Sequence, residues 1–258
     1  MTSLHRHLRT MLFAVIFLAA CPALADNLPR TVERIKLSVV GIGTMEQTRR
    51  PPLEARGTGF AVGDGLHVIT NLHVIPPVLE VDKKEMLGIM VGRGETARFR
   101  EAKQVAVDAD HDLALLRIEG TPLTPVKLDP DTPQEGQSIA FTGFPIGNVL
   151  GLYPVTHRGT ISAITPIVIP AASSRLLDAR VVNRMRAPYT VLQLDGTAYP
   201  GSSGSPVYDA DSGTVYGIVN MVFIKSTKES ALSEPSGISY AIPAKYIREL
   251  INKAGLKP

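Results

Sequence analysis

The chain has 258 residues, a formal net charge of +3 and a single cysteine, Cys21. Arg6 and Arg9 lie in the first 25 residues, and without them the charge is about +1, which gives no reason to expect a nucleic-acid partner. The length is sufficient to bury the core of one large domain or of a double barrel. With one cysteine, the chain cannot form a disulfide within itself.

Residues 1–25 have the three parts of an export signal. Arg6 and Arg9 form the basic region, Met11 to Ala20 the apolar stretch, and Ala23-Leu24-Ala25 the small-residue cleavage site. The apolar stretch is too short to cross a bilayer as a helix, which disfavours a retained N-terminal anchor. We therefore expect residues 1–25 to be a signal peptide and the mature protein to be periplasmic or secreted.

Cys21 allows a second interpretation of this region. Leu18-Ala19-Ala20-Cys21 resembles a bacterial lipobox, in which the cysteine is lipidated and becomes the new N-terminus. Pro22 directly after a lipidated cysteine would be unusual, so we favour cleavage after Ala25 and a soluble product. Both interpretations place the protein in the cell envelope or beyond.

After this region, short segments rich in Val and Ile alternate with turns that contain Gly, Pro and Asp. The predicted strands are Leu37–Gly43, Gly57–Val62, His67–Thr70, Gly88–Gly92, Gln104–Val107, Leu113–Ile118, Ser138–Thr142, Val155–Ile164, Tyr189–Leu194, Val215–Phe223 and Ile238–Ile242. Their even spacing predicts an all-β sandwich or barrel. Segments 45–55, 166–188 and 225–236 are expected as loops.

Two segments have a helical pattern. Residues 29–36 fit a short lead-in helix, and Pro243 opens a helix over 244–254 with an apolar stripe suited to packing. Between the predicted strands, residues 120–136 carry four prolines with acidic residues among them. This composition predicts a linker between two β halves of similar size, about residues 37–120 and 137–242.

The segment T-A-Y-P-G-S-S-G-S-P-V, Thr197–Val207, predicts a tight turn around Ser203. Its proline and glycine residues exclude a helix interior. A turn whose backbone N–H groups are unpaired and point at one spot would suit an oxyanion hole. Alone, the segment is equally compatible with a Ser/Gly turn on the surface.

His73 and Asp112 favour a catalytic role for Ser203 over a surface turn. His73 follows an apolar strand, and Asp112 directly precedes another. A serine nucleophile needs a base for its proton and an acid that orients the base. The order His73, Asp112, Ser203 is the order of the chymotrypsin triad, and it divides the three residues between the two β halves.

These segments resemble the motifs of chymotrypsin-superfamily serine proteases, in particular the bacterial trypsin-like, Deg/HtrA-like group. The motifs are Gly57-Thr-Gly-Phe, Ile69-Thr-Asn-Leu-His-Val, His111-Asp-Leu-Ala-Leu-Leu, Phe141-Thr-Gly-Phe-Pro-Ile-Gly, Gln193-Leu-Asp-Gly, Pro200-Gly-Ser-Ser-Gly-Ser-Pro and Gly237-Ile-Ser-Tyr-Ala-Ile-Pro. The resemblance covers roughly residues 37–250. It implies two six-stranded antiparallel Greek-key β-barrels, a short C-terminal helix and a catalytic site between the barrels.

The resemblance also implies roles for individual residues. Ser203 would be the nucleophile, His73 the general base and then acid, and Asp112 its orienter. The backbone N–H groups of Gly201 and Ser203 would form the oxyanion hole. Asn220 falls where the superfamily has a polar residue beside the buried acid.

Residues 220–222 would bind substrate. This strand, Asn220, Met221 and Val222, would pair with the substrate backbone by β-augmentation. Met221 and Phe223 suggest apolar pocket walls and hence small or medium aliphatic side chains before the cut. Asp195 lies eight residues before Ser203, which does not support a preference for basic residues.

The nucleophile motif departs from the usual family pattern, which is Gly-Asn-Ser-Gly-Gly-Pro. Ser202 replaces a residue that we expect to face outward, at small cost. Ser205 replaces a glycine, as it does in glutamyl endopeptidases of the same superfamily. Those enzymes need a histidine near the specificity pocket, and residues 217–223 contain none, so glutamate specificity is not supported.

We therefore expect an exported serine endopeptidase without a PDZ domain that cleaves protein or peptide substrates and uses no cofactor. A protease-fold binding or chaperone module, or a resting protease activated by a ligand, is the alternative. A lipase elbow would need glycine where Ser205 stands. The separated histidines and the absence of a Cys-x-x-Cys motif predict no metal ligands. His111 is expected to face solvent and His157 to lie at the surface or in a cleft.

Overall fold

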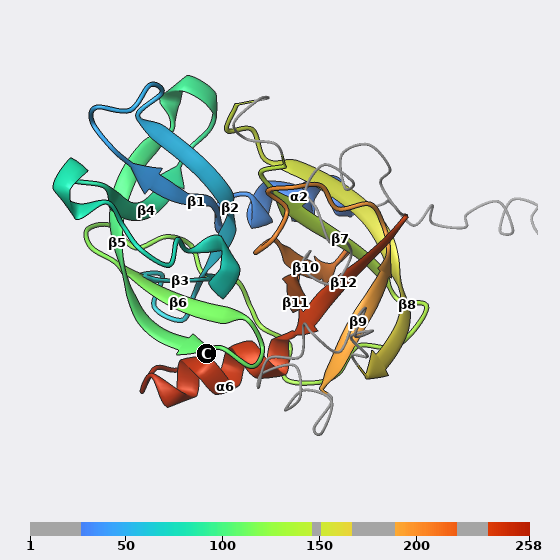
Figure 1. The fold of residues 1–258 in the computed structure, drawn as a ribbon. Coiled ribbons are helices and arrows are strands. Elements are labelled where there is room, and N and C mark those ends of the chain that lie inside the picture. Colours follow the sequence, from blue (N-terminus) through green and yellow to red (C-terminus); the bar gives the residue numbers. More distant parts are fainter. Residues whose placement is uncertain (1–26, 146–150, 167–188, 221–236) are drawn as a thin grey trace, which may run out of the picture.

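The computed structural model describes residues 27–145, 151–166, 189–220 and 237–258, which form two closed antiparallel β-barrels side by side (Figure 1). The first barrel consists of β1 (Val39–Met45), β2 (Leu53–Val62), β3 (His67–Asn71), β4 (Met86–Val91), β5 (Arg98–Asp108) and β6 (Leu113–Ile118). The second consists of β7 (Ser138–Gly143), β8 (Val155–Pro166), β9 (Thr190–Asp195), β10 (Pro206–Asp209), β11 (Val215–Val219) and β12 (Ile238–Pro243). The prediction of two six-stranded barrels is confirmed.

Both barrels have the same strand order. Around the first barrel the strands follow one another as β1-β2-β3-β6-β5-β4, and around the second as β7-β8-β9-β12-β11-β10. All neighbouring strands in the two barrels are antiparallel. In this order β3 lies beside β6, so the end of β3 meets the start of β6, a point that matters for the site.

Residues 120–136 connect the barrels and are bonded to both. The backbone N–H groups of Leu123 and Val126 donate to the first barrel, at the carbonyls of Gly65 and Ala61. Leu128 forms a parallel bridge with Val215 of β11 in the second barrel. The connection is therefore held at both barrels by backbone hydrogen bonds.

Two α-helices and three 3₁₀ turns complete the described fold. The α-helices are α2 (Leu28–Ile35) and α6 (Ala244–Lys253), and the 3₁₀ turns are Leu72–Val74, Val81–Lys83 and Gly94–Thr96. The predicted apolar stripe of α6 is buried, at Tyr246, Ile247, Leu250 and Ile251. Figure 1 shows α6 below β6 of the first barrel, with its first turn at the end of β12 of the second.

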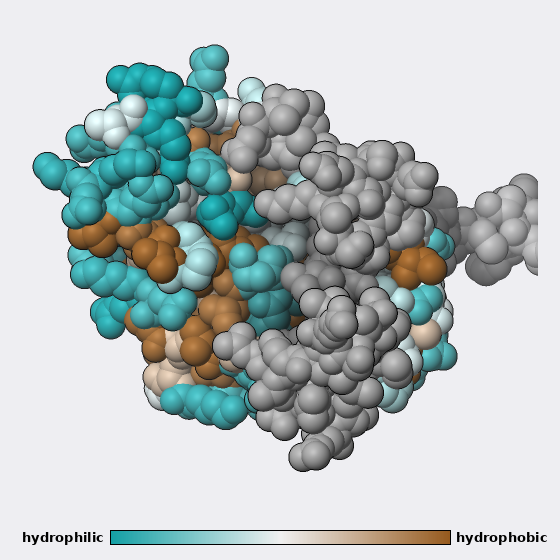
Figure 2. Space-filling view, viewed as in Figure 1, coloured by the Kyte–Doolittle hydropathy of each residue, from teal (hydrophilic) through white to brown (hydrophobic). Residues whose placement is uncertain are grey.

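One apolar cluster joins the two barrels and α6. Its members include Phe60, Ile69 and Leu113 of the first barrel, Ile218 and Ile242 of the second, and Ile247 of the helix. Hydrophilic residues cover most of the face of the first barrel seen in Figure 2, and hydrophobic residues gather toward its middle, nearer the second barrel. Since burial of apolar surface is the main favourable term in folding, this shared cluster couples the stability of the two barrels.

Most predicted strands were found, with ends shifted by a few residues, but two segments differ. The strand β10 was missed, because Pro206 directly follows the Ser/Gly turn and only four residues pair before the next turn. The predicted loop 45–55 contains the start of β2 at Leu53. The loop predicted over 166–188 is described only at Pro166, which ends β8, and the predicted loop 225–236, the predicted signal peptide 1–25 and Cys21 lie outside the described residues.

Within the described ranges, neither helix is long and apolar enough to span a membrane.

We predict that Ile247→Ala lowers the free energy of unfolding by about 2–5 kcal/mol, because the side chain is fully buried in the shared cluster. Urea denaturation followed by circular dichroism measures this change. Val81→Ala is the control, since its side chain is 77% exposed, and should change stability by less than about 0.5 kcal/mol. An equal effect of both changes would contradict the role of the cluster.

Candidate active site

The strand order brings His73 and Asp112 together. Asn71, the last residue of β3, pairs with Leu113, the first residue of β6. His73 lies in the 3₁₀ turn after β3, and Asp112 directly precedes β6, so the two residues lie at the same end of this strand pair. His73 Nδ1 is 2.5 Å from Asp112 Oδ2, and the His73 backbone N–H donates to Asp112 Oδ1 at 2.9 Å. The predicted pair is therefore in contact.

Asp112 is also fixed by three further hydrogen bonds. Asn220 Nδ2, from the second barrel, donates to Asp112 Oδ2 at 2.7 Å. The backbone carbonyl of Asp112 accepts from the N–H of Leu72 at 3.0 Å and from Asn71 Nδ2 at 3.2 Å. The Asp112 side chain is 15% exposed. Donors from both barrels thus occupy this carboxylate.

The backbone of Asp112 is in the left-handed region, at φ +54°. Such a conformation costs a residue other than glycine about 1–2 kcal/mol, although aspartate adopts it more readily than most. It persists where surrounding contacts hold it in place. The hydrogen bonds to the Asp112 carbonyl and carboxylate supply such contacts.

The Ser203 turn is anchored between the two barrels. The Thr58 N–H, on β2 of the first barrel, donates to Ser203 O at 2.8 Å, and Thr58 Oγ1 donates to Gly201 O at 2.8 Å. On the other side, the Gly204 N–H donates to Val219 O of β11 at 3.0 Å. The turn therefore has the tight, glycine-dependent form that the sequence predicts, with positive φ at Gly201 and Gly204.

Two backbone donors in this turn have no acceptor within the described part of the chain. The N–H groups of Gly201 and Ser203 donate to no other described residue, although their neighbours Ser202 and Gly204 donate to Tyr199 O and Val219 O. These are the two N–H groups expected to form the oxyanion hole. Free backbone donors in a fixed turn are what such a site requires.

The two serines that depart from the family pattern are both buried. The prediction that Ser202 faces outward was wrong: it is 1% exposed, and its Oγ accepts from the Tyr199 N–H at 3.3 Å, which closes the turn. Ser205 fits against Gly143 of β7, where an added Cβ would lie 1.9 Å from Ser205 Oγ. The larger residue at position 205 thus uses space left by a glycine.

Gly57 lies where the Ser203 turn comes close to the segment that carries His73. A Cβ at Gly57 would lie 2.8 Å from the side chain of Val74 and 3.0 Å from Ser203 O, so Val74 and Ser203 flank the same glycine. Val74 is the neighbour of His73. The hydrogen bonds of the described residues do not include one between Ser203 Oγ and His73, a bond that is often long before substrate binds.

The predicted substrate-binding strand is described only at its first residue. Asn220 is buried, and its side chain is directed at Asp112 while its backbone N–H donates to Tyr240 O. Met221 and Val222 lie outside the described residues. The pairing of this strand with substrate remains a prediction.

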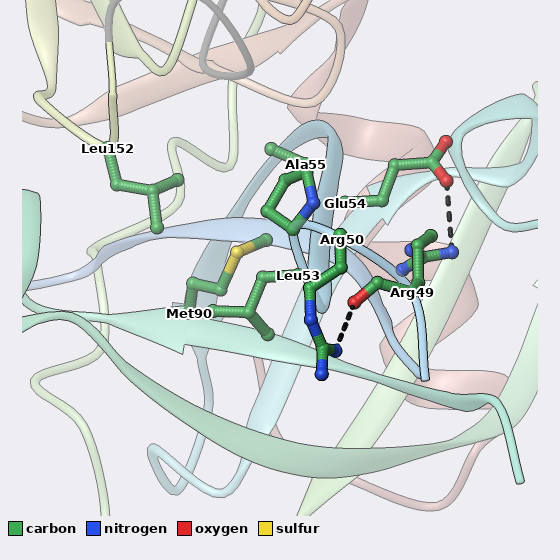
Figure 3. A pocket seen from close by; sticks show the side chains of 8 residues that line it. Arg49, Arg50, Leu53, Glu54, Ala55, Met90 and Leu152 are labelled. Carbon is green, nitrogen blue, oxygen red and sulfur yellow. Dashed lines mark hydrogen bonds and ion pairs between the residues drawn. The ribbon is translucent and has the colours of Figure 1, made fainter. Parts of the chain in front are cut away.

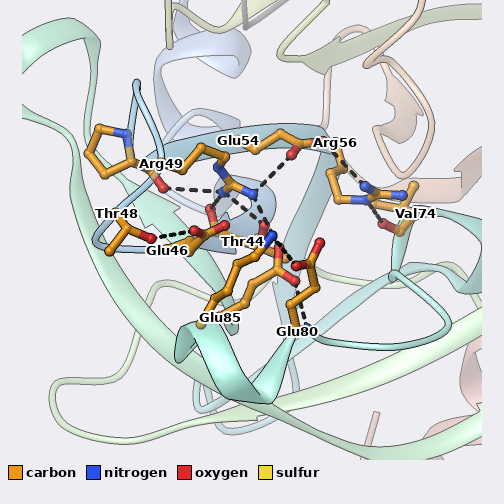
Figure 4. A network of polar contacts seen from close by, with 11 residues as sticks. Thr44, Glu46, Thr48, Arg49, Glu54, Arg56, Val74, Glu80 and Glu85 are labelled. Carbon is orange, nitrogen blue, oxygen red and sulfur yellow. Dashed lines mark hydrogen bonds and ion pairs between the residues drawn. The ribbon is translucent and has the colours of Figure 1, made fainter.

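A polar network that the sequence did not indicate supports the histidine segment (Figure 4). Arg56 Nε donates to Val74 O at 3.1 Å, and Arg56 pairs with Glu54 at 3.3 Å. Glu54 in turn pairs with Arg49, which also contacts Glu85 at 3.2 Å. Hydrogen bonds from the Thr44 side chain and the Glu80 N–H, with the Arg49 contact, lower the pKa of Glu85. Because Val74 and Glu85 lie far from Arg49 and Arg56 in the sequence, periodicity and motifs could not reveal the network.

A cavity of about 360 Å³ lies at the start of β2, away from the triad residues (Figure 3). Its lining residues are Arg49, Arg50, Pro51, Leu53, Glu54, Ala55, Met90 and Leu152. None of His73, Asp112 and Ser203 lines it. The candidate site therefore rests on the contacts of its residues and not on this cavity.

Two further histidines, His111 and His157, are partly buried and contact other side chains. His111 was predicted to face solvent, but its side chain is only 18% exposed and contacts Asp108 and aromatic rings. His157 stacks on Phe141 with ring centroids 5.0 Å apart, and burial lowers the pKa of His157. Among the described residues, no group of three His, Cys, Asp or Glu side chains could hold a metal ion.

Residues 57–218 match the model of the trypsin-like peptidase domain. The chain belongs to this family. It is 30% identical over 218 residues to "Protease Do-like 5, chloroplastic" of Arabidopsis thaliana, covering 82% of this chain and 60% of the relative. It is 29% identical over 196 residues to a "Probable periplasmic serine endoprotease DegP-like" of Pseudomonas fulva, covering 76% of this chain and 34% of that protein.

A solved structure shares the fold of this trypsin-like peptidase. The serine endoprotease from Yersinia pestis aligns with a TM-score of 0.60 and 24% identity, covering 88% of this chain and 66% of that chain. The chain thus spans about a third to three fifths of the two curated relatives that it matches. The Deg/HtrA-like resemblance of the motifs is confirmed by these matches.

We predict that Gly204→Ala disrupts the Ser203 turn. An alanine Cβ would lie 1.8 Å from Thr58 O, and φ at this position is +90°, so both space and backbone conformation oppose it. The free energy of unfolding should fall by more than about 2 kcal/mol in urea denaturation. Gly237→Ala is the matched control, because a Cβ there meets no atom within 4 Å, and it should remain as stable as the wild type.

Proposed function

We propose that this trypsin-like peptidase is an exported serine endopeptidase that cleaves peptide bonds through Ser203, His73 and Asp112 and an acyl-enzyme. The observation that carries the proposal is the position of Asp112, whose carboxylate binds both His73 Nδ1 and Asn220. A carboxylate that is held on two sides and contacts one nitrogen of an imidazole is the arrangement that orients a general base.

The chemistry follows from which atoms are occupied. Because Asp112 accepts from Nδ1 of His73, the neutral ring carries its proton on Nδ1 and leaves Nε2 free to accept another. Nε2 takes the proton of the Ser203 hydroxyl as Oγ attacks the substrate carbonyl, and later gives it to the leaving amine. Asp112 stabilises the imidazolium that forms between these steps.

The oxyanion of the tetrahedral intermediate would lie at the N–H groups of Gly201 and Ser203. Thr58 holds the carbonyls of these same two residues, at 2.8 Å in each case. This anchoring fixes the turn before substrate arrives, so its donors need little reorganisation during the reaction. Removing one such donor in other serine proteases costs about 10²–10³ in kcat.

Substrates and compartment are inferred from the same site and from the N-terminus. The predicted strand from Asn220 to Val222 would pair with the acyl side of a protein or peptide substrate, with a preference for aliphatic side chains before the cut. The signal in residues 1–25 and the periplasmic description of the Pseudomonas fulva relative support export. The product would be periplasmic or secreted.

Covalent labelling of the purified mature protein with a fluorophosphonate probe tests the nucleophile. We expect one label on Ser203, none in Ser203→Ala, and a strong decrease in His73→Ala, because the base activates the hydroxyl. Mass spectrometry of the labelled peptide identifies the residue. A folded wild type that takes no label would instead support a binding module of the protease fold, or a resting protease that needs a ligand.

A second prediction concerns Asp112→Asn. The amide can keep the size of the side chain but offers Nδ1 of His73 a donor, so the imidazole is held in the wrong tautomer. By analogy with the chymotrypsin triad, turnover of a peptide or casein substrate should fall by about 10⁴. Circular dichroism and urea denaturation should show that the variant is folded, and full activity in this variant would refute the role of Asp112.

A further inference from the structure

The backbone at Asp112 is held on its C-terminal side by the barrel itself. Its carbonyl accepts two hydrogen bonds from residues 71 and 72, and β6 begins at the next residue. Its left-handed φ of +54° means that the chain turns sharply at this residue. The direction in which the carboxylate points therefore also depends on what holds the residue before it.

His111 is that residue, and its contacts fix the turn between β5 and β6. Its backbone N–H donates to Asp108 Oδ1 at 3.1 Å, and its Nδ1 is 2.7 Å from Asp108 Oδ2. Asp108 is the last residue of β5, and its side chain is 9% exposed. Both oxygens of one buried carboxylate thus hold the main chain and the ring of His111.

The ring of His111 is also packed against the C-terminal helix. It stacks on Tyr246 of α6, with centroids 3.8 Å apart and an interplanar angle of 20°. Tyr189 meets the His111 ring edge-on, with centroids 4.6 Å apart, and also meets the Tyr246 ring edge-on. The His111 ring is therefore held by two tyrosine rings that come from outside β5 and β6.

Helix α6 is connected to Asp112 by a second route. It follows β12 directly, and Tyr240 of β12 accepts the N–H of Asn220, whose side chain donates to Asp112. The same β12–α6 unit thus approaches Asp112 from the carboxylate side through Asn220 and from the backbone side through His111. The β12–α6 unit therefore contacts, through Asn220 and through His111, the residues that hold Asp112 on both sides.

We infer that His111 is a positioning residue for the proposed triad: clamped between Asp108 and Tyr246, it sets the backbone of Asp112 and so the alignment of Asp112 with His73. This inference rests on the proposed function. It assigns to α6, which supplies none of the proposed catalytic residues, a part in holding the acid of the triad.

The chain contains a matched comparison for this clamp. His67 makes the same contact with a carboxylate three residues earlier, Nδ1 to Asp64 Oδ1 at 2.8 Å, in the turn between β2 and β3 of the same barrel. His67 is buried, but no triad residue directly follows it, and it has no aromatic stacking partner among the described ring contacts. Replacing either histidine by alanine removes a similar contact with a carboxylate, but only His111 is the direct neighbour of Asp112.

The charges around His111 determine how its loss should affect pH dependence. Asp108 and Asp112 are its acidic neighbours, Lys253 of α6 acts on Asp108, and Lys245 lies over the Tyr246 ring at 4.7 Å. Burial alone would raise the pKa of Asp108, but the hydrogen bonds from His111 outweigh burial and lower it. Asp108 therefore remains ionised through the neutral range, and the clamp is intact there.

The experiment measures the second-order rate of fluorophosphonate labelling at Ser203 against pH in His111→Ala, Tyr246→Ala, Tyr246→Phe and His67→Ala. We expect His111→Ala to label about 10- to 100-fold more slowly at neutral pH, since small misplacements of catalytic groups have effects of this size. Tyr246→Ala should slow labelling in the same direction. Tyr246→Phe, which keeps the stacked ring, and His67→Ala should label as the wild type does.

The acid limb of the labelling profile separates positioning from general destabilisation. A general base must be neutral to accept the Ser203 proton, and an aligned carboxylate favours the charged imidazole, so poor alignment of Asp112 should extend labelling to lower pH. The acid limb should therefore move to lower pH in His111→Ala and Tyr246→Ala, and should not move in His67→Ala. Labelling is carried out at a temperature where circular dichroism shows each variant to be folded.

Each outcome supports or overturns the inference. Wild-type labelling with an unchanged rate and acid limb in His111→Ala overturns it and leaves the proposed function standing, whereas absence of labelling in the wild type overturns the proposed function. If His111→Ala does not fold, Tyr246→Ala against Tyr246→Phe decides: equal rates and limbs in these two variants overturn the role of the stacked ring.

Discussion

The hydrogen bonding of the Asp112 carboxylate is the interaction on which the candidate site depends. His73 contributes Nδ1 and its backbone N–H, and Asn220 contributes its amide, so the first and second barrels meet at one carboxylate that is largely withdrawn from solvent. A buried carboxylate is tolerated only when donors replace the water that it has lost. Here the replacement comes from groups that also have a part in the proposed chemistry. The contact that satisfies the Asp112 carboxylate therefore also orients His73, and neither barrel could make the full arrangement alone.

The fold supplies this geometry through strand order and through one threonine. Because β3 pairs with β6 out of sequence order, residues 39 positions apart lie at neighbouring strand ends. Thr58, on β2, then holds the carbonyls of Gly201 and Ser203 and, through its Oγ1, accepts from the N–H of Phe144 of the second barrel. A short side chain that donates and accepts at once suits a narrow contact between two barrels. The Ser203 turn is thus fixed to the barrel that carries His73.

The sequence could predict the parts of this protein that depend on local pattern. Leu113–Ile118 was predicted with its observed bounds, because an apolar run between two turns defines a buried strand, and His73 and Asp112 were found from motif order. Ser202 was misjudged because the direction of a turn side chain depends on φ at Gly201, which no spacing reveals. His111 was misjudged because its partners Tyr189 and Tyr246 are distant in sequence. Ser202 and His111 were both predicted to be exposed, whereas their contacts in the folded chain withdraw them from solvent.

The distribution of buried polar residues explains why the site lies where it does. Apolar side chains fill both barrels, but Thr58, Thr70, Asn71, Ser202 and Asn220 are all buried and gather around the line where the Ser203 turn meets β2 and β3. Most of their polar atoms are paired with backbone groups, so burial there fixes one arrangement and adds little net stability. Apolar residues at these positions could pack as well but would leave the backbone carbonyls of Gly201 and Asp112 without these donors. The contact between the barrels thus buries polar side chains that fix the position of each proposed catalytic group. The shared apolar cluster around α6 stabilises the two barrels against each other.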